Sequence, residues 1–168
     1  MMDGNCNVYD ELSIKPGYND GLTNGWIAGW SNIYYTSNWA TDHSPQNDWA
    51  IIVLDRDIGN NTGWCGIQYY DSNSDLIRKT GYAYGYPGGQ SLGYFEYQWM
   101  TSGFISSVNS TEFDIGTLFG GGISGGPVYL EETNGMIVGM CKGAYLDYDD
   151  LSVCTRITQN MVDIVNGI

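Results

Sequence analysis

Residues 122–127 read Gly-Ile-Ser-Gly-Gly-Pro and lead directly into the apolar residues 128–130, Val-Tyr-Leu. Glycines beside a serine allow backbone conformations that other residues avoid, and they let a substrate approach the serine closely. Ser124 is therefore the first candidate for a catalytic nucleophile. The alternative interpretation of this stretch is a glycine-rich turn between two strands.

The composition predicts an all-β chain. Glycine (24) and tyrosine (14) are abundant, and short apolar stretches alternate with turn-forming residues, which is typical of barrels and sandwiches. The expected strands cover residues 32–36, 49–54, 79–86, 94–101, 103–108, 127–130, 136–141 and 152–157. At the C-terminus a helical spacing of apolar residues predicts a short helix, capped by Thr158, that packs one face on the barrel. The residues of that face are Met161, Ile164, Val165 and Ile168.

The charge balance excludes some classes of partner. The 168 residues carry 19 acidic and 6 basic side chains, for a net charge of -13, which argues against nucleic acid or an anionic membrane. No apolar run approaches membrane-spanning length, and the first residues lack the features of a signal peptide. Four cysteines beside few lysines favour an oxidising compartment. We therefore expect a secreted protein whose leader is not in this chain.

A serine hydroxyl needs a base that takes its proton, and this base is normally an imidazole oriented by a carboxylate. Asp48 is the better carboxylate candidate, because it directly precedes residues 49–54, Trp-Ala-Ile-Ile-Val-Leu, which are apolar enough for a core strand. A carboxylate at that position can be held rigid. The alternative is an ordinary turn residue before a strand.

Several motifs follow one another in order over most of the chain. They are Asn-Asp-Trp-Ala-Ile-Ile at 47–52, Gly-Tyr-Pro-Gly-Gly at 85–89, Gln-Trp at 98–99, Ser-Gly at 102–103, the serine stretch at 122–127, Val-Gly-Met at 138–140 and Thr-Arg-Ile at 155–157. Taken together, they make the sequence similar to the trypsin-like serine proteases and, within them, to the bacterial glutamyl-endopeptidase-like branch.

The resemblance implies an all-β, trypsin-like double β-barrel. Residues 1–60 would form an incomplete N-terminal barrel, and residues 61–168 the C-terminal barrel with its short terminal helix. The implied function is a serine endopeptidase that cleaves proteins or peptides without a cofactor or metal ion. Ser124 would be the nucleophile, Asp48 the orienting acid, and the N–H groups of Gly122 and Ser124 the oxyanion hole.

The histidine departs from the family pattern. Family members carry it upstream of the aspartate, usually as a His-Cys pair, whereas the nearest equivalent here is Asn5-Cys6 and the only histidine is His43. Asparagine cannot act as the base. Three explanations are open: the chain is a fragment that begins after the histidine; it is an inactive homologue that binds peptides or a protein through the old cleft; or His43 swings into the site.

The residues that the resemblance places beside the substrate side chain also depart from the branch. Glutamyl endopeptidases carry a histidine where this chain has Cys141, so a preference for glutamate is not implied. Phe119 at the base of the pocket suggests an apolar or small substrate side chain. Lys142, next to Gly143, either restores some preference for acids or is a solvated surface lysine. Cys141 and Cys154 lie on neighbouring pocket strands and form either a disulfide or two buried free thiols.

Overall fold

The computed structural model describes residues 11–88, 95–144 and 150–168. Asn5 and Cys6, Gly89, and Tyr94 at the start of one expected strand lie outside these ranges. The chain divides into two compact units, Met1–Trp64 (unit 1) and Cys65–Ile168 (unit 2).

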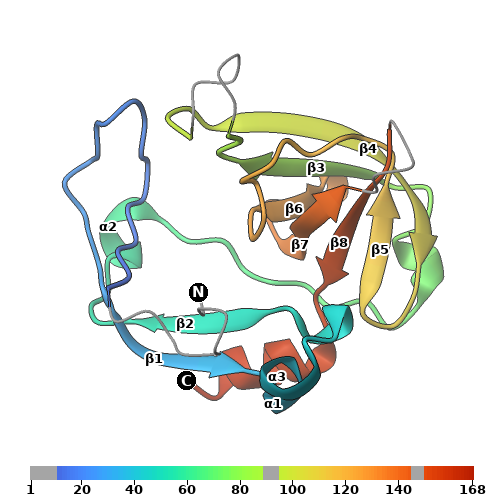
Figure 1. The fold of residues 1–168 in the computed structure, drawn as a ribbon, viewed down its shortest axis with the longest axis horizontal. Coiled ribbons are helices and arrows are strands. Elements are labelled where there is room, and N and C mark those ends of the chain that lie inside the picture. Colours follow the sequence, from blue (N-terminus) through green and yellow to red (C-terminus); the bar gives the residue numbers. More distant parts are fainter. Residues whose placement is uncertain (1–10, 89–94, 145–149) are drawn as a thin grey trace. The chain divides into compact units, whose positions relative to one another are not determined.

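Unit 1 contains a two-stranded antiparallel sheet in which Tyr35 pairs with Ala50 and Ile33 with Ile52. The connection between the strands begins at Thr36, whose side chain accepts a hydrogen bond from Trp39 N–H and caps a short helix. Figure 1 shows the two strands as blue and cyan arrows. The elements are β1 (Trp30–Tyr35), α1 (Ser37–Asp42), the 3-10 helix η1 (Pro45–Asn47), β2 (Ala50–Leu54) and α2 (Gly59–Thr62).

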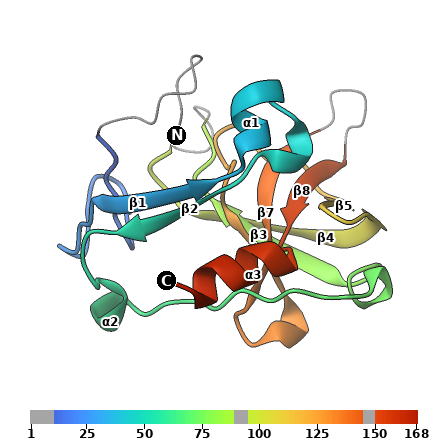
Figure 2. The same ribbon diagram turned by 90° about the horizontal axis from the view of Figure 1, so that it is seen from below.

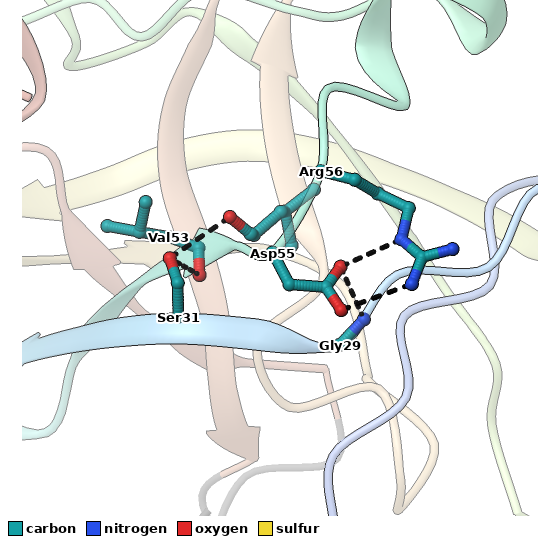
Figure 3. Close-up of polar contacts among 6 residues, drawn as sticks. Gly29, Ser31, Val53, Asp55 and Arg56 are labelled. Atoms are coloured by element: carbon teal, nitrogen blue, oxygen red, sulfur yellow. Dashed lines mark hydrogen bonds and ion pairs between the residues drawn. The ribbon is translucent and has the colours of Figure 1, made fainter.

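Hydrogen bonds and an ion pair stabilise this sheet at the end where β1 begins and β2 ends (Figure 3). Asp55 accepts a hydrogen bond from Gly29 N–H at 3.0 Å and is paired with Arg56, whose Nε lies 3.0 Å from Asp55 Oδ1. Beside it, Ser31 Oγ donates to the carbonyl oxygens of Val53 and Leu54. The hydrogen bond from Arg56 is the main cause that lowers the pKa of Asp55.

Unit 2 is a closed barrel of six strands in the order β3-β4-β5-β8-β7-β6 (Figure 1). Every neighbouring pair of strands is antiparallel, and the last strand in this order, β6, pairs with the first, β3. Inward residues alternate along the strands, as in Val128 and Leu130, and form a continuous apolar core. The strands are β3 (Thr80–Gly85), β4 (Trp99–Val108), β5 (Glu112–Ile115), β6 (Pro127–Leu130), β7 (Ile137–Ala144) and β8 (Ser152–Arg156). The 3-10 helix η2 (Asn73–Asp75) precedes β3, and η4 (Glu131–Thr133) lies between β6 and β7.

The chain ends in helix α3 (Gln159–Asn166), which follows β8 and is drawn in red in Figure 2. Thr158 is its cap, as expected, and accepts a hydrogen bond from Met161 N–H at 3.5 Å. The buried face of the helix is narrower than predicted: Met161 is buried and Ile164 is partly buried, but Val165 and Ile168 are exposed. Ile168 lies beyond the helix, which ends at Asn166. In the part of the chain that the structure describes, no helix is long and apolar enough to cross a membrane.

The predicted all-β fold is confirmed, with three corrections in detail. The strands expected at 94–101 and 103–108 contribute to one strand, β4, because Ser102, the residue between them, continues the ladder and pairs with Tyr82. A Cβ on Gly103 would overlap the backbone of Gly116, so this glycine permits a close approach of two chain segments. Strand β5 and helix α1 were not predicted.

Candidate active site

Ser124 lies in a tight turn between the end of β5 and the start of β6. Gly126 N–H donates to Ile123 O at 2.9 Å and closes the turn. The turn is fastened to β7 by two bonds with Cys141, whose carbonyl accepts from Gly125 N–H and whose N–H donates to Gly126 O, both at 2.7 Å. Gly125 has a φ of 83°, which explains why a glycine follows the serine. The Ser124 side chain is thereby presented at the surface of the barrel.

The backbone before Ser124 offers two N–H groups to a ligand. Gly122 has a φ of 97°, a conformation that favours glycine. Within the described residues, neither Gly122 N–H nor Ser124 N–H donates to another group of the protein, and both residues are exposed. Backbone donors that are free and held by a rigid turn are what an oxyanion hole requires.

Ile123 anchors this turn from the inside. Its side chain is only 6% exposed and belongs to the barrel core. It packs so closely on Gly85 of β3 that a Cβ there would overlap it. The residues on both sides of Ile123 are exposed, so one buried side chain anchors the turn between the two N–H groups that have no partner among the described residues.

The hydroxyl of Ser124 donates to the carbonyl of Lys142 at 3.1 Å. Lys142 has no register partner on β8, because the pairing shifts between Cys141 and Gly143 and leaves Lys142 in a β-bulge. Bulges redirect the backbone and side chain of the extra residue and recur beside active sites. Here the bulge directs a carbonyl toward the serine.

The Lys142 side chain is not a solvated surface lysine. Its ammonium forms an ion pair with Glu112 of β5, and both side chains are largely buried, with 14% and 16% of their area exposed. The charge of Lys142 is therefore satisfied within the protein. This arrangement does not favour Lys142 as the group that would bind an acidic substrate side chain.

Cys141 and Cys154 are direct cross-strand partners on β7 and β8, as the alignment of the pocket strands requires. They are free thiols, so the alternative of a disulfide is not what the structure shows. Burial raises the pKa of Cys141 to about 12 and raises that of Cys154 as well. Because the thiolate is the reactive form, both thiols are poorly reactive in the folded protein.

The other two residues expected at the substrate pocket differ in their surroundings. Phe119 is 7% exposed, belongs to the barrel core, and donates its N–H to Ser152 Oγ at 3.0 Å. Gly143 on β7 faces open space, since a Cβ built on it meets no described atom within 4 Å. Cys141 and Phe119 therefore both belong to the apolar core of the barrel, whereas the space beside Gly143 is open.

The two candidate triad residues of unit 1 are both exposed. Asp48 ends η1 just before β2, and its N–H donates to Pro45 O at 3.3 Å. His43 ends α1 in the left-handed conformation, with its ring packed edge-on against Trp39 at a centroid distance of 5.3 Å. The structure thus places Asp48 before the apolar strand, as predicted, and gives His43 a local contact within unit 1.

Sequence reasoning missed two residues that contact the site. Glu112, the partner of Lys142, lies 30 positions away on the unpredicted strand β5, and its only signal was the alternation of Glu-Phe-Asp-Ile. Phe95 packs on Gly122, and a Cβ on Gly122 would overlap its ring. No pattern in the sequence indicated this contact.

Known proteins resemble this chain in sequence and in structure. No protein-family model matches the chain. A glutamyl endopeptidase of Bacillus licheniformis is 29% identical over 139 residues, which cover 78% of this chain and 42% of that protein. The structure of a Glu endopeptidase in complex with MPD superposes with a TM-score of 0.79 and 26% identity, over 92% of this chain and 70% of that one.

In sequence and in fold the chain is similar to the trypsin-like serine proteases of the glutamyl-endopeptidase-like branch. A thermostable serine protease from an extremophilic microorganism shares the fold, with a TM-score of 0.76 and 18% identity over 92% of this chain and 73% of that protein. This glutamyl-endopeptidase-like chain spans less than half the length of the Bacillus relative.

Proposed function

We propose that the protein is a serine endopeptidase in which Ser124 attacks the scissile carbonyl of a peptide. The developing oxyanion is stabilised by Gly122 N–H and Ser124 N–H, a histidine takes and returns the proton, and Asp48 orients that histidine. The observation that carries the proposal is the Ser124 turn, with its exposed serine, its glycine at φ 97° and two N–H groups that have no hydrogen-bond acceptor among the described residues.

The proposal takes the base from outside these 168 residues. His43 is the only histidine of the chain, and its ring is already packed on Trp39. Removing the base from a serine protease lowers turnover by about a million-fold, although an oxyanion hole and substrate binding retain some rate enhancement. The chain alone is therefore expected to be nearly inactive while its serine turn is intact.

For the substrate we propose a protein or peptide with an apolar or small side chain before the scissile bond. Two arrangements support this choice over glutamate. Cys141 and Phe119 are buried and apolar, and the ammonium of Lys142 is paired with Glu112. We also propose that the protein acts outside the cell, on the ground of its four cysteines and few lysines; fractionation of the source cells tests this.

The second candidate function is a binding module without catalysis. It is favoured by the single histidine of the chain and by the exposure of Asp48. A module of this kind would keep the cleft for peptides and lose the chemistry. The two candidates differ in whether Ser124 becomes nucleophilic when an imidazole is supplied.

Chemical rescue with free imidazole separates them. Labelling of Ser124 by a fluorophosphonate is measured by mass spectrometry at increasing imidazole concentrations. For an endopeptidase scaffold we expect negligible labelling without imidazole, labelling that increases with imidazole, and none in Ser124→Ala. His43→Ala is the matched control and should behave like the unmodified chain.

Three results would contradict the proposal in different ways. Rapid labelling without imidazole that disappears in His43→Ala would identify His43 as the base. Equally slow labelling at all imidazole concentrations, together with binding of a peptide, would favour the binding module. Labelling that persists in Ser124→Ala would show that Ser124 is not the nucleophile.

A further inference from the structure

Phe95 combines two features that rarely occur together. It is a bulky residue with a φ of 70°, a conformation that favours glycine. Its ring is also 53% exposed, so the strained conformation does not serve to bury it in the core. Unfavourable backbone conformations persist where surrounding structure enforces them, and they concentrate at functional sites.

The ring of Phe95 lies against the backbone of two glycines. A Cβ on Gly122 would overlap Phe95 Cε1 and Cδ1, and a Cβ on Gly88 would overlap Cζ and Cε1 of the same ring. Only glycines at both positions permit this contact. Phe95 N–H donates to Pro87 O at 3.1 Å, which ties Phe95 to the segment that carries Gly88.

Phe95 and Ile123 contact the serine turn from two different sides. Ile123 is buried in the barrel core, whereas the exposed ring of Phe95 covers the backbone of the preceding residue, Gly122, from the solvent side. Glycine has the greatest conformational freedom of all residues. The carbonyl of the peptide that carries Gly122 N–H, Gly121 O, accepts a hydrogen bond from Gly88 N–H at 2.5 Å. Because the ring of Phe95 packs on both Gly88 and Gly122, it supports the two segments that this bond joins, and without the ring the peptide would be held by this bond alone.

We infer that Phe95 is a positioning residue that holds Gly122 N–H in the orientation needed for the oxyanion hole. This inference rests on the proposed function for its catalytic meaning. Stabilisation of an oxyanion depends on donors that are fixed before the reaction, since a donor that must reorient loses part of its effect. Phe95 would act through Gly122 without touching the reacting atoms.

The test compares four forms of the full chain: unmodified, Phe95→Ala, Phe95→Tyr and Phe104→Ala. Phe104 is a matched control, because it is an exposed phenylalanine of the same unit, with 68% of its area exposed on β4. The first readout is the 15N order parameter of Gly122 N–H, which needs no activity. A rigid backbone gives values of about 0.85, and a flexible one gives values below about 0.6.

We expect the order parameter of Gly122 to fall below about 0.6 in Phe95→Ala and to stay near 0.85 in Phe95→Tyr and Phe104→Ala. The urea midpoint should change little in any variant, because both phenylalanines are exposed. The second readout is the rate at which Ser124 is labelled in the presence of imidazole. This rate should fall about tenfold in Phe95→Ala alone, a smaller loss than the removal of a whole oxyanion-hole donor causes.

The two readouts separate the inference from the function on which it rests. If the unmodified chain is never labelled but Gly122 loosens only in Phe95→Ala, the proposed function fails and the positioning role stands. An unchanged Gly122 order parameter in Phe95→Ala overturns the inference, whatever the labelling shows. Equal loosening in Phe104→Ala also overturns it, because the effect would then be general.

Discussion

Adding one methyl group to Gly126 tests how strictly the backbone around Ser124 is constrained. A Cβ at this position would lie 2.9 Å from the carbonyl oxygen of Ile123 and would overlap the carbonyl oxygen of Tyr84 on β3. Both are backbone atoms, so no side-chain rotation relieves the contact. The strands must shift, and the bond from Gly126 N–H to Ile123 O that closes the turn must lengthen.

Overpacking of this kind costs about 1–3 kcal/mol, and we expect Gly126→Ala to reduce the free energy of unfolding of unit 2 by that amount. Gly121→Ala is the matched control. Gly121 lies in the same loop, has no positive φ, and a Cβ on it meets no described atom within 4 Å. Its expected effect is within about 0.5 kcal/mol.

The assay must report on unit 2. Tryptophan fluorescence is unsuitable, because Trp99 is the only tryptophan of unit 2 and the other five, which lie in unit 1, would dominate the signal. Urea unfolding followed by NMR from the amides of β6 and β7 gives the midpoint and slope for the barrel itself. If Gly126→Ala and Gly121→Ala unfold at the same urea concentration, the turn is not held as tightly as we argue.

Other changes test the surroundings of the turn. Glu112→Gln should destabilise unit 2 by about 1–3 kcal/mol, because it leaves the largely buried ammonium of Lys142 without its partner; the double variant Glu112→Leu/Lys142→Met should recover most of this loss in the same urea assay. Burial raises the pKa of Cys141 to about 12 and raises that of Cys154, whereas an unfolded thiol titrates near 8.5. The two thiols therefore contribute full stability below about pH 8.5 and lose it as pH rises toward the folded pKa, by about 1.4 kcal/mol per thiol and pH unit; a urea midpoint that is constant from pH 8 to 10 would contradict this. Thr158→Ala should cost about 0.5–1 kcal/mol through loss of the helix cap, measured as a lower thermal midpoint.

Local patterns in the sequence were sufficient for much of the fold. The run from Pro127 to Leu130 and the glycines around Ser124 predicted a strand and a tight turn at the right positions, because both depend on neighbouring residues alone. Thr158 was predicted as a cap for the same reason. Strand β5 was missed because Glu112 and Asp114 interrupt its apolar residues and both residue types are depleted in strands, even though Glu112–Ile115 alternate between partly and fully buried.

The remaining features of the site depend on contacts between distant segments. The ion pair of Lys142 requires β5 and β7 to lie on either side of β8 in the barrel. Two strands were expected on either side of Ser102, whereas β4 runs through it, and the close approach of the neighbouring Gly103 to Gly116 is visible only in three dimensions. The position of Phe95 over Gly122 is likewise a tertiary contact between residues with no shared pattern.

The most direct test of the central claim is a crystal structure of the chain after Ser124 has been phosphonylated in the presence of imidazole. The distances to measure run from the phosphoryl oxygen to Gly122 N and to Ser124 N. Our account predicts that both lie within about 2.7–3.1 Å, the range for donors in an oxyanion hole. A phosphoryl oxygen directed to solvent, more than about 3.5 Å from both nitrogens, would show that the turn is not a catalytic site.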